Sequence, residues 1–296
     1  IEIKFYQLKL GLKLMDMSLQ YSIKRFMNEI SVKTPAKLNL HLQVISRRGD
    51  GFHDLRTLFT YIDLFDDLNF KIAEEKIELK EKEPIKDNLV LKAAEILRKR
   101  TNCNKGVNIS LQKKIPIQKG LGGGSSDAAA TIIALNKLWD LGLTNKELLD
   151  LSLELGSDVP FFVFGHTAWA EGRGEILYKI DFKEEWFLLS MPKAQISTEK
   201  AFKALSSSFS QPFTYEEYCT KGGFNSFEKW ARYSYKEIDE TFLKLEKIGK
   251  PRLSGTGSSI FVSFNSLKQA EAANKEFPDC ILVKSLERSP LMQIIE

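Results

Sequence analysis

Four glycines within five residues stand where this sequence changes from a strand pattern to a helix pattern: Gly120, Gly122, Gly123 and Gly124. The preceding NISLQKKIPI predicts a strand and its exit loop, and the following SDAAATIIALNKLWDLG predicts a helix with Ser126 as N-cap and Gly142 beyond its end. Glycines let a backbone turn with its N–H groups facing inward, and a helix N-terminus adds free donors and partial positive charge. The segment is therefore predicted to bind an anion such as phosphate.

Two better-known glycine motifs do not fit this spacing. The P-loop pattern GxxxxGK[ST] needs a lysine at a place where the run has none. The dinucleotide pattern GxGxxG fails because Ser125 stands where its third glycine should be. A purely structural turn remains an open alternative, since glycines also permit tight packing.

Length, charge and cysteine usage exclude several classes of protein. The 296 residues suffice for one large or two ordinary domains, and a net charge of +4 gives no reason to expect a nucleic-acid partner. Cys103, Cys219 and Cys280 lie far apart without CxxC spacing, which argues against a disulfide framework and a zinc site. No apolar run approaches the roughly 20 residues of a membrane helix. We therefore expect a cytoplasmic protein with no membrane partner.

The order of strand and helix patterns indicates the fold class. Residues 1–26 fit no signal peptide, and we interpret them as an extraneous or leader segment before a natural start at Met27. The patterns that follow show no regular βαβ repetition, which predicts an α+β protein of two domains. A change of composition near residues 168–172 places these domains at residues 27–169 and 170–296.

Periodicity predicts the individual elements. In the first domain we expect a helix over 87–100 with Asp87 or Asn88 as N-cap, a helix from a Thr144–Glu147 capping box to Gly156, and a buried strand over 159–164. In the second we expect a strand at 186–192, a short helix at 201–205, a loop at 206–213, a long broken helix within 224–249, a strand at 258–264, a helix at 266–277 and a final strand at 280–286.

A strict period of two over residues 38–44 predicts a half-buried strand. Leucines and a valine occupy one face, and the other face carries Lys37, Asn39, His41 and Gln43. In an arbitrary strand, such a polar face would be solvated. Lys37 and Asn39 nevertheless share a face, so both can project into one cavity.

The segment PIQKGLGGGSSDAA closely resembles the Pro-x3-Gly-Leu-Gly-x-x-Ser-Ser phosphate loop of the GHMP kinase superfamily. Its GLGGGSS form is similar to that of the kinases that act on 4-diphosphocytidyl-2-C-methyl-D-erythritol. Four further segments agree, in order along the chain: TPAKLNLHL at 34–42, RRGDGFHDLRTLF at 47–59, GSDVPFFVFG at 156–165 and RLSGTGSSIFV at 252–262. They resemble the PAKINL, DGYH-x-x-x-T, GADVPFF and second glycine-rich motifs of that family.

The resemblance implies a two-domain GHMP kinase fold, with a ribosomal-protein-S5-like ATP-binding domain followed by a ferredoxin-like substrate domain. It implies ATP with Mg²⁺ as cofactor and transfer of phosphate to the 2-hydroxyl of the cytidine substrate, in the non-mevalonate route to isoprenoid precursors. It further implies a bacterial cytoplasmic protein, with the plastid stroma as alternative, and a monomer or weak homodimer.

Two residues match the catalytic positions of the family. Asp158 would be the base, and Lys37 would lie beside it, keep it ionised and neutralise developing charge. Taken without the motif, an Asp in a turn before Pro160 is more often a local backbone cap, and a lone lysine is nearly always a solvated surface residue.

The remaining motif residues are implied to bind the two substrates. The nucleotide set is Pro116, Gly120, Leu121, Gly122, Gly123, Gly124, Ser125, Ser126 and Asp127, with the Ser126 hydroxyl a possible Mg²⁺ contact and no protein metal ligand identified. The acceptor set is Asn39, Phe52, His53, Thr198, Phe202, Gly255 and Gly257. His53 would hydrogen-bond the cytosine, and Phe52 stands where a tyrosine usually stacks on it, which keeps the stacking face and drops a hydroxyl.

Two other functions stay open at this point. One is a different GHMP kinase, of the mevalonate, homoserine or galactose type, against which the DGFH segment argues. The other is a nucleotide-binding sensor without catalysis, although Lys37 and Asp158 are the residues that such a protein would have lost. His41 and His166 match no motif and are interpreted as structural.

Overall fold

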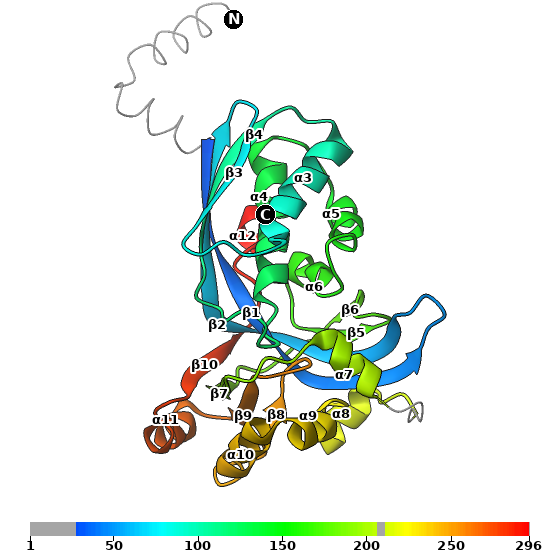
Figure 1. The fold of residues 1–296 in the computed structure, drawn as a ribbon, viewed down its shortest axis with the longest axis vertical. Coiled ribbons are helices and arrows are strands. Elements are labelled where there is room, and N and C mark those ends of the chain that lie inside the picture. Colours follow the sequence, from blue (N-terminus) through cyan, green and yellow to red (C-terminus); the bar gives the residue numbers. More distant parts are fainter. Residues whose placement is uncertain (1–27, 206–210, 296) are drawn as a thin grey trace, which may run out of the picture.

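One continuous sheet joins two groups of helices (Figure 1). A computed structural model describes residues 28–205 and 211–295. In this part of the chain the strand order is β3-β4-β2-β10-β7-β9-β8, with β1 and β5 also paired to β2, and β6 paired to β5. The mixture of helices and strands confirms the α+β prediction. The predicted leader, residues 1–26, and most of the predicted loop at 206–213 lie outside the described residues.

Two long antiparallel strands form the centre of the molecule. β1 (Glu29–Arg47) pairs with β2 (His53–Ala73) along almost its whole length. Three shifts of register, at Pro35/Ala36, Asn39/His41 and Val44/Ser46, interrupt the pairing. Such bulges bend a strand, and Figure 1 shows both strands curving from the first group of helices to the second. The same strands therefore contribute to both halves of the fold.

The polar face of β1 is buried, so the expectation of a solvated face is wrong. Lys37, Asn39, His41 and Gln43 are all buried, like the leucines opposite them. The physical reason is that β1 passes between the two halves of the molecule, so protein covers both of its faces. A polar side chain in such a place needs a partner.

The first half packs helices against β1, β2 and the shorter strands β3 (Ile77–Glu81) and β4 (Gly106–Gln112). α3 (Leu89–Thr101) begins after Asn88, whose side chain accepts from the backbone of Val90 at 2.9 Å, so Asn88 is the N-cap. α5 (Asn145–Ser152) has the predicted capping box between Thr144 and Glu147.

The helix after the glycines starts earlier than predicted. α4 (Gly123–Leu138) has Gly122 as its N-cap, in the left-handed conformation with φ 71°. Because a glycine makes this turn at no steric cost, the helix begins directly after it. Ser126 is therefore a buried residue of the first turn and not the N-cap.

The apolar run at 159–164 is a helix, α6 (Val159–Phe164), and not the predicted strand. A proline in its first turn suits a helix start, and Gly165 in the left-handed conformation ends it. Because Phe161 and Phe162 are both fully buried, the segment shows no amphipathic pattern. Periodicity alone cannot tell such a helix from a buried strand.

The second half contains the predicted elements together with further strands and helices that the periodicity did not predict. The hairpin of β5 (Ala168–Glu171) and β6 (Ile176–Lys179) extends the sheet, because β5 pairs with β2. Beyond it lie β7 (Trp186–Ser190), α7 (Thr198–Ala204), α8 (Tyr215–Lys221), α9 (Glu228–Ser234), α10 (Lys236–Leu245), β8 (Arg252–Leu253), β9 (Ile260–Phe264), α11 (Leu267–Glu276) and β10 (Ile281–Leu286). The predicted long helix breaks at Tyr235, between α9 and α10. The periodicity did not predict α8 or the strands β5, β6 and β8.

The C-terminal segment returns to the first half. β10 pairs with β7 on one side and with β2 on the other, and α12 (Met292–Ile295) then packs beside α4 (Figure 1). Leu291 is fully buried in the core formed by α3, α4, α5 and α6. The division into residues 27–169 and 170–296 thus stays a proposal, since both the sheet and the last residues cross it.

Candidate active site

The glycine loop joins β4 to α4 and lies against β1. Gly120 and Gly122 have φ values of 72° and 71°, in the region that favours glycine. The backbone N–H of Lys37 donates to the carbonyl of Leu121 at 2.9 Å, which fixes the loop to the strand. A Cβ on Gly122 would come within 2.9 Å of the Phe162 ring and 3.0 Å of the Lys37 side chain. The glycines thus permit close packing of the loop against β1 and α6, and they leave the N-terminus of α4 exposed to the cavity.

A cavity of about 280 Å³ lies over this loop. It is lined by Ile85, Asp87, Asn88, Leu89, Lys113, Ile115, Pro116, Ile117, Gln118, Lys119, the loop residues Gly120 to Ser125, and Asp127. The Ser126 hydroxyl is buried in the first turn of α4 without a hydrogen-bond partner in the described part of the chain. A buried hydroxyl beside free helix N–H donors fits a bound phosphate, so these residues suit a nucleoside triphosphate.

The Asp127 carboxylate is turned into the protein beneath the loop. It accepts from the Thr34 hydroxyl at 2.7 Å and from the Lys113 ammonium at 2.8 Å, and Lys113 also bridges to the fully buried Asp66. Burial raises the pKa of Asp127 to about 6, while Lys113 opposes that rise. These contacts tie α4 to β1 and β2, so the side chain of Asp127 positions the loop.

Lys37 and Asp158 form an ion pair beside the loop. The Lys37 Nζ lies 3.6 Å from Asp158 Oδ2 and donates to Asn39 Oδ1 at 2.5 Å. Asn39 in turn donates to Thr57 at 2.9 Å. The shared face predicted for Lys37 and Asn39 is confirmed, because the two side chains touch.

The two ends of this ion pair differ in their exposure to solvent. The side chain of Lys37 is 4% exposed, whereas that of Asp158 is 37% exposed. Burial lowers the pKa of the Lys37 ammonium, and the neighbouring Asp158 raises it. Asp158 stands at the N-cap position of α6, but its side chain makes no capping hydrogen bond. The carboxylate can therefore meet a substrate, and the reading of Asp158 as a backbone cap does not hold.

The second glycine loop, between β8 and β9, packs directly on the first. The Ser254 hydroxyl donates to the Gly120 carbonyl at 3.0 Å, and the Ser259 backbone donates to the Lys119 carbonyl at 3.2 Å. A Cβ on Gly255 would lie 3.3 Å from Gly120 and 3.5 Å from the Lys37 Nζ. This contact brings a loop of the second half to the ion pair.

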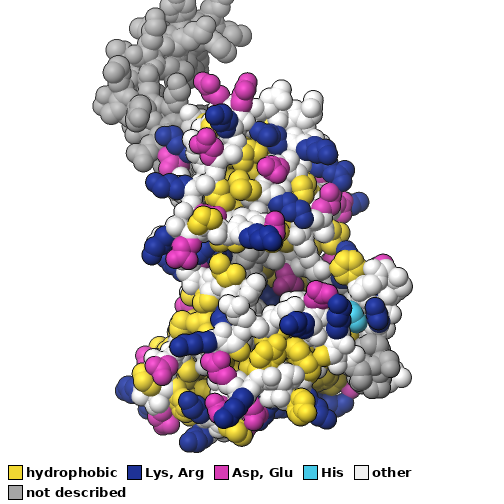
Figure 2. Space-filling view, viewed as in Figure 1, with side chains coloured by type: hydrophobic (Ala, Val, Ile, Leu, Met, Phe, Trp, Pro, Cys, Tyr) yellow, Lys and Arg dark blue, Asp and Glu magenta, His cyan; other side chains and the backbone are white. Residues whose placement is uncertain are grey.

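The residues implied to bind the acceptor base lie at the tip of the β1–β2 hairpin and on α7. The His53 and Phe202 rings are 4.7 Å apart, which places these two together. Thr198, the first residue of α7, lies with its hydroxyl 3.3 Å from that of Thr256 in the second glycine loop. On the face shown in Figure 2, a hollow with an acidic side chain inside it and basic side chains at its rim separates the two halves of the molecule.

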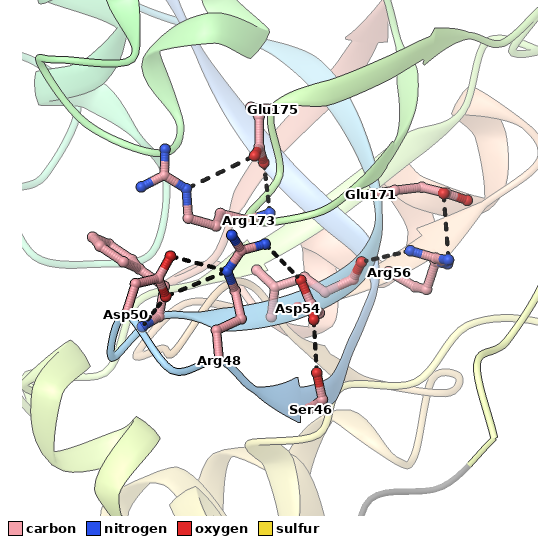
Figure 3. A network of polar contacts seen from close by, with 10 residues as sticks. Ser46, Arg48, Asp50, Asp54, Arg56, Glu171, Arg173 and Glu175 are labelled. Carbon is pink, nitrogen blue, oxygen red and sulfur yellow. Dashed lines mark hydrogen bonds and ion pairs between the residues drawn. The ribbon is translucent and has the colours of Figure 1, made fainter.

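Phe52 is 47% exposed and lies under an arginine that the motif comparison did not single out. The guanidinium carbon of Arg173 is 4.6 Å from the centroid of the Phe52 ring. Figure 3 shows the surrounding network, in which Arg48 contacts Asp50 and Asp54, and Arg56 pairs with Glu171. Aromatic and cationic groups are thus concentrated where a nucleotide base is expected.

Comparison with known proteins decides the family. Residues 88–166 match the family model for the GHMP kinases N terminal domain. A 4-diphosphocytidyl-2-C-methyl-D-erythritol kinase of Nitrosococcus oceani is 40% identical over 270 residues, which are 88% of this chain and 96% of that protein. One of Pasteurella multocida is 38% identical over 269 residues, with 88% and 91% covered. The chain belongs to the 4-diphosphocytidyl-2-C-methyl-D-erythritol kinase family.

A crystal structure named 4-(cytidine 5'-diphospho)-2C-methyl-D-erythritol kinase agrees, with a TM-score of 0.75 and 30% identity over 86% of this chain and 99% of that one. A mevalonate kinase structure has a TM-score of 0.63 at 16% identity, covering 88% and 99%, and shows the shared fold. The GHMP kinase fold predicted from the motifs is confirmed.

The sequence reasoning missed several residues that build this site. Lys113 lines the cavity, Lys119 donates to the carbonyls of Pro192 and Ala194, and Asn225 donates to the carbonyls of Leu253 and Gly255. A signal for Lys113 and Lys119 existed, because Lys113 directly follows the strand β4 and Lys119 directly precedes the first glycine of the run. Nothing local marks Asn225, whose contacts come from tertiary packing.

Residues 28–205 and 211–295 contain neither a metal-binding cluster nor a membrane-spanning helix. No group of three or more His, Cys, Asp or Glu side chains that could hold a metal ion occurs among them. No helix in these ranges is both long and apolar enough to span a bilayer.

Proposed function

We propose that this chain transfers the γ-phosphate of ATP to the 2-hydroxyl of 4-diphosphocytidyl-2-C-methyl-D-erythritol, giving the 2-phosphate and ADP. Family membership supports the reaction. The single structural observation that carries it is the Lys37–Asp158 ion pair, 3.6 Å long, beside the glycine loop. An acceptor alcohol held there would meet a base and a phosphate site at once.

Asp158 acts as the general base in this proposal. Its carboxylate accepts the proton of the 2-hydroxyl and orients the oxygen toward the γ-phosphorus. The buried Lys37 keeps Asp158 ionised and holds its carboxylate in place, while Asn39 fixes the Lys37 ammonium. Phosphoryl transfer passes through a loose transition state, so positioning and charge neutralisation matter more than a strong base.

The glycine loop and the start of α4 would hold the triphosphate. The residues from Gly122 to Ser125 line the cavity, and their backbone N–H groups precede the first hydrogen bond within α4, so they would stabilise the negative charge of the triphosphate. When bound, Mg²⁺ would help neutralise the charge of the triphosphate. The Ser126 hydroxyl, which has no hydrogen-bond partner among the described residues, would be a protein contact for it. Asp127 contributes by holding α4 in place through Thr34 and Lys113.

The cytosine would bind between Phe52 and Phe202, with His53 as its hydrogen-bond partner. The contact between His53 and Phe202 supports this placement. Thr198, Gly255 and Gly257 would complete the acceptor side through α7 and the second glycine loop. We place the protein in the bacterial cytoplasm, as a monomer or weak homodimer.

A coupled ADP-release assay with the cytidine substrate tests the function. We expect turnover by the wild-type protein and a fall of about a hundredfold or more in kcat for Asp158→Ala, because a positioned general base contributes that much. Binding of an ATP analogue to Asp158→Ala should stay within about twofold of wild type, since Asp158 does not line the cavity over the glycine loop. Full activity of Asp158→Ala would remove the assignment of the base.

A panel of acceptor alcohols provides the control for the substrate. Mevalonate, homoserine and galactose are offered with ATP under the same conditions. Phosphorylation of one of these but not of the cytidine substrate would contradict the proposed function. Tight ATP binding without turnover of any acceptor would indicate a sensor.

A further inference from the structure

The proposed acceptor carries two ionised phosphates between its cytosine and its reacting alcohol, and the inference below rests on that proposed function. The base end is assigned to Phe52, His53 and Phe202, and the reacting end to Lys37 and Asp158. The diphosphate must lie between them. Burying such a dianion without a cation would be costly, and a guanidinium is the side chain that best matches phosphate oxygens.

Arg173 lies between these two ends. Its turn joins β5 to β6, and the Gly172 carbonyl accepts from the Leu55 backbone at 2.6 Å, which anchors the turn on β2 just beyond His53. On the other side, a Cβ on Gly174 would lie 3.8 Å from the Ser157 carbonyl, next to Asp158. The turn therefore spans from the hairpin tip to the catalytic segment.

The guanidinium of Arg173 is stacked on Phe52, with its central carbon 4.6 Å from the ring centroid. Figure 3 shows it directed away from Arg56 and Glu171, on the side of the hairpin where Asp50 lies. A planar guanidinium that stacks on a ring keeps its N–H donors at its edge, free to meet an anion in the same plane. Stacking and phosphate binding are thus compatible.

Neighbouring arginines are already engaged, whereas Arg173 has donors to spare. Arg48 lies 3.1 Å from both Asp50 and Asp54, and Arg56 lies 3.3 Å from Glu171. The only ion pair of Arg173 within the described residues joins its Nε to Glu175 at 3.8 Å, which is longer than a hydrogen bond. Its two terminal nitrogens make no hydrogen bond in this part of the chain.

We propose that Arg173 binds the diphosphate of the acceptor and thereby makes the site selective for a nucleoside-diphosphate-linked alcohol. The phosphate oxygens accept from the edge of the guanidinium while its face stays on Phe52. A residue that only braced Phe52 would affect base stacking and not the phosphates. The two roles differ in which part of the ligand they affect.

Calorimetric titration with CDP and with cytidine separates these roles, in the presence of a saturating non-hydrolysable ATP analogue. For Arg173→Gln we expect CDP affinity to fall about tenfold or more and cytidine affinity to change by less than about twofold, because only CDP carries the charge. Arg173→Lys should retain part of the CDP affinity. Arg56→Gln is the matched control, since that arginine pairs with Glu171, and it should bind both ligands as wild type does.

Two results would overturn the proposal: an unchanged CDP affinity in Arg173→Gln, or an equal loss for CDP and cytidine. Thermal melting of each variant shows that it is folded. If Arg173→Gln does not fold, the salt dependence of CDP affinity is measured in the wild-type protein and in Arg173→Lys. CDP affinity that does not fall with added salt in either protein would contradict an ionic contact. Turnover of the cytidine substrate by the wild type is measured separately. If the wild type shows no turnover but CDP binding still depends on Arg173, the proposed function is wrong and the proposed role of Arg173 stands.

Discussion

At the scale of single residues, the ion pair of Lys37 and Asp158 shows how burial changes what a side chain can do. A lysine on a strand would ordinarily face water, yet Lys37 is buried and paired with Asp158 and Asn39. An ammonium is taken out of water only where its charge is compensated. The burial of Lys37 is therefore independent support for the role that its motif implies.

His41 is a second buried polar residue on the same strand. Its ring stacks between Trp169 and Phe213, with centroid distances of 5.5 and 4.9 Å. Burial, with a smaller effect of Arg252, lowers the pKa of His41 from 6.5 to about 4. The imidazole is thus neutral in the folded protein at a pH where the unfolded chain binds a proton.

This difference predicts acid sensitivity. Because the pKa of His41 is lower in the folded protein, the free energy of unfolding is highest above pH 6.5. It falls as the pH drops toward 4, since only the unfolded chain gains a proton there. Between these pH values the wild-type protein should lose free energy of unfolding on the order of 3 kcal/mol through His41. His41→Phe keeps the ring stacking and should not show this loss. Urea unfolding of both proteins from pH 7 to pH 4 measures it. Parallel stability profiles for the two proteins would contradict the assignment.

At the scale of elements, the site is a contact between two glycine-rich loops from distant parts of the chain. Gly120 meets the backbone of Ser254 so closely that a Cβ would lie 2.2 Å from the Ser254 carbonyl oxygen. Hydrogen bonds from Ser254 and Ser259 join the same loops. Each loop thus sets the shape of the other.

Gly120→Ala should force these loops apart. The substitution combines a left-handed φ of 72° with the contact to Ser254, and we expect a loss of stability of about 1–3 kcal/mol or more. Gly124→Ala is the matched control, because a Cβ there would meet only Leu89 at an ordinary 3.8 Å. That change, within a helix, should cost nothing and can add up to about 1 kcal/mol. Equal destabilisation of the two variants in urea unfolding would refute this account.

At the scale of the whole molecule, the last residues close the structure. Leu291 is fully buried in the core of the first half, although it follows the final strand of the second half. This return places α12 beside α4, the helix that begins directly after the glycine loop. The two halves are therefore expected to unfold together.

Leu291→Ala tests this coupling. A cavity at a fully buried leucine costs about 2–5 kcal/mol, so the whole protein should lose that stability in one transition. Leu243→Ala removes the same atoms from a side chain that is 53% exposed, and should change stability by about 0.5 kcal/mol or less. Calorimetry of both variants gives the comparison. Two separate transitions for Leu291→Ala would argue against a single cooperative unit.

The sequence by itself determined the local parts of this protein. The capping box at Thr144 and the period of two in β1 depend on neighbours in the chain, so the sequence predicted them directly. The sequence also predicted a helix after the glycine run, but not that Gly122 is its N-cap. The motif order likewise indicated the fold and the kinase family. The helix at 159–164 could not be predicted, because a segment that is buried on all sides has no amphipathic pattern to distinguish a helix from a strand.

Only the tertiary structure decided which side chains meet. The burial of Lys37, the pairing of Asp127 with Lys113, and the position of Arg173 over Phe52 join segments far apart in the chain. Such contacts depend on how the bulged strands β1 and β2 curve between the two groups of helices. Burial and charge pairing are properties of that packing, and no spacing in the sequence encodes them.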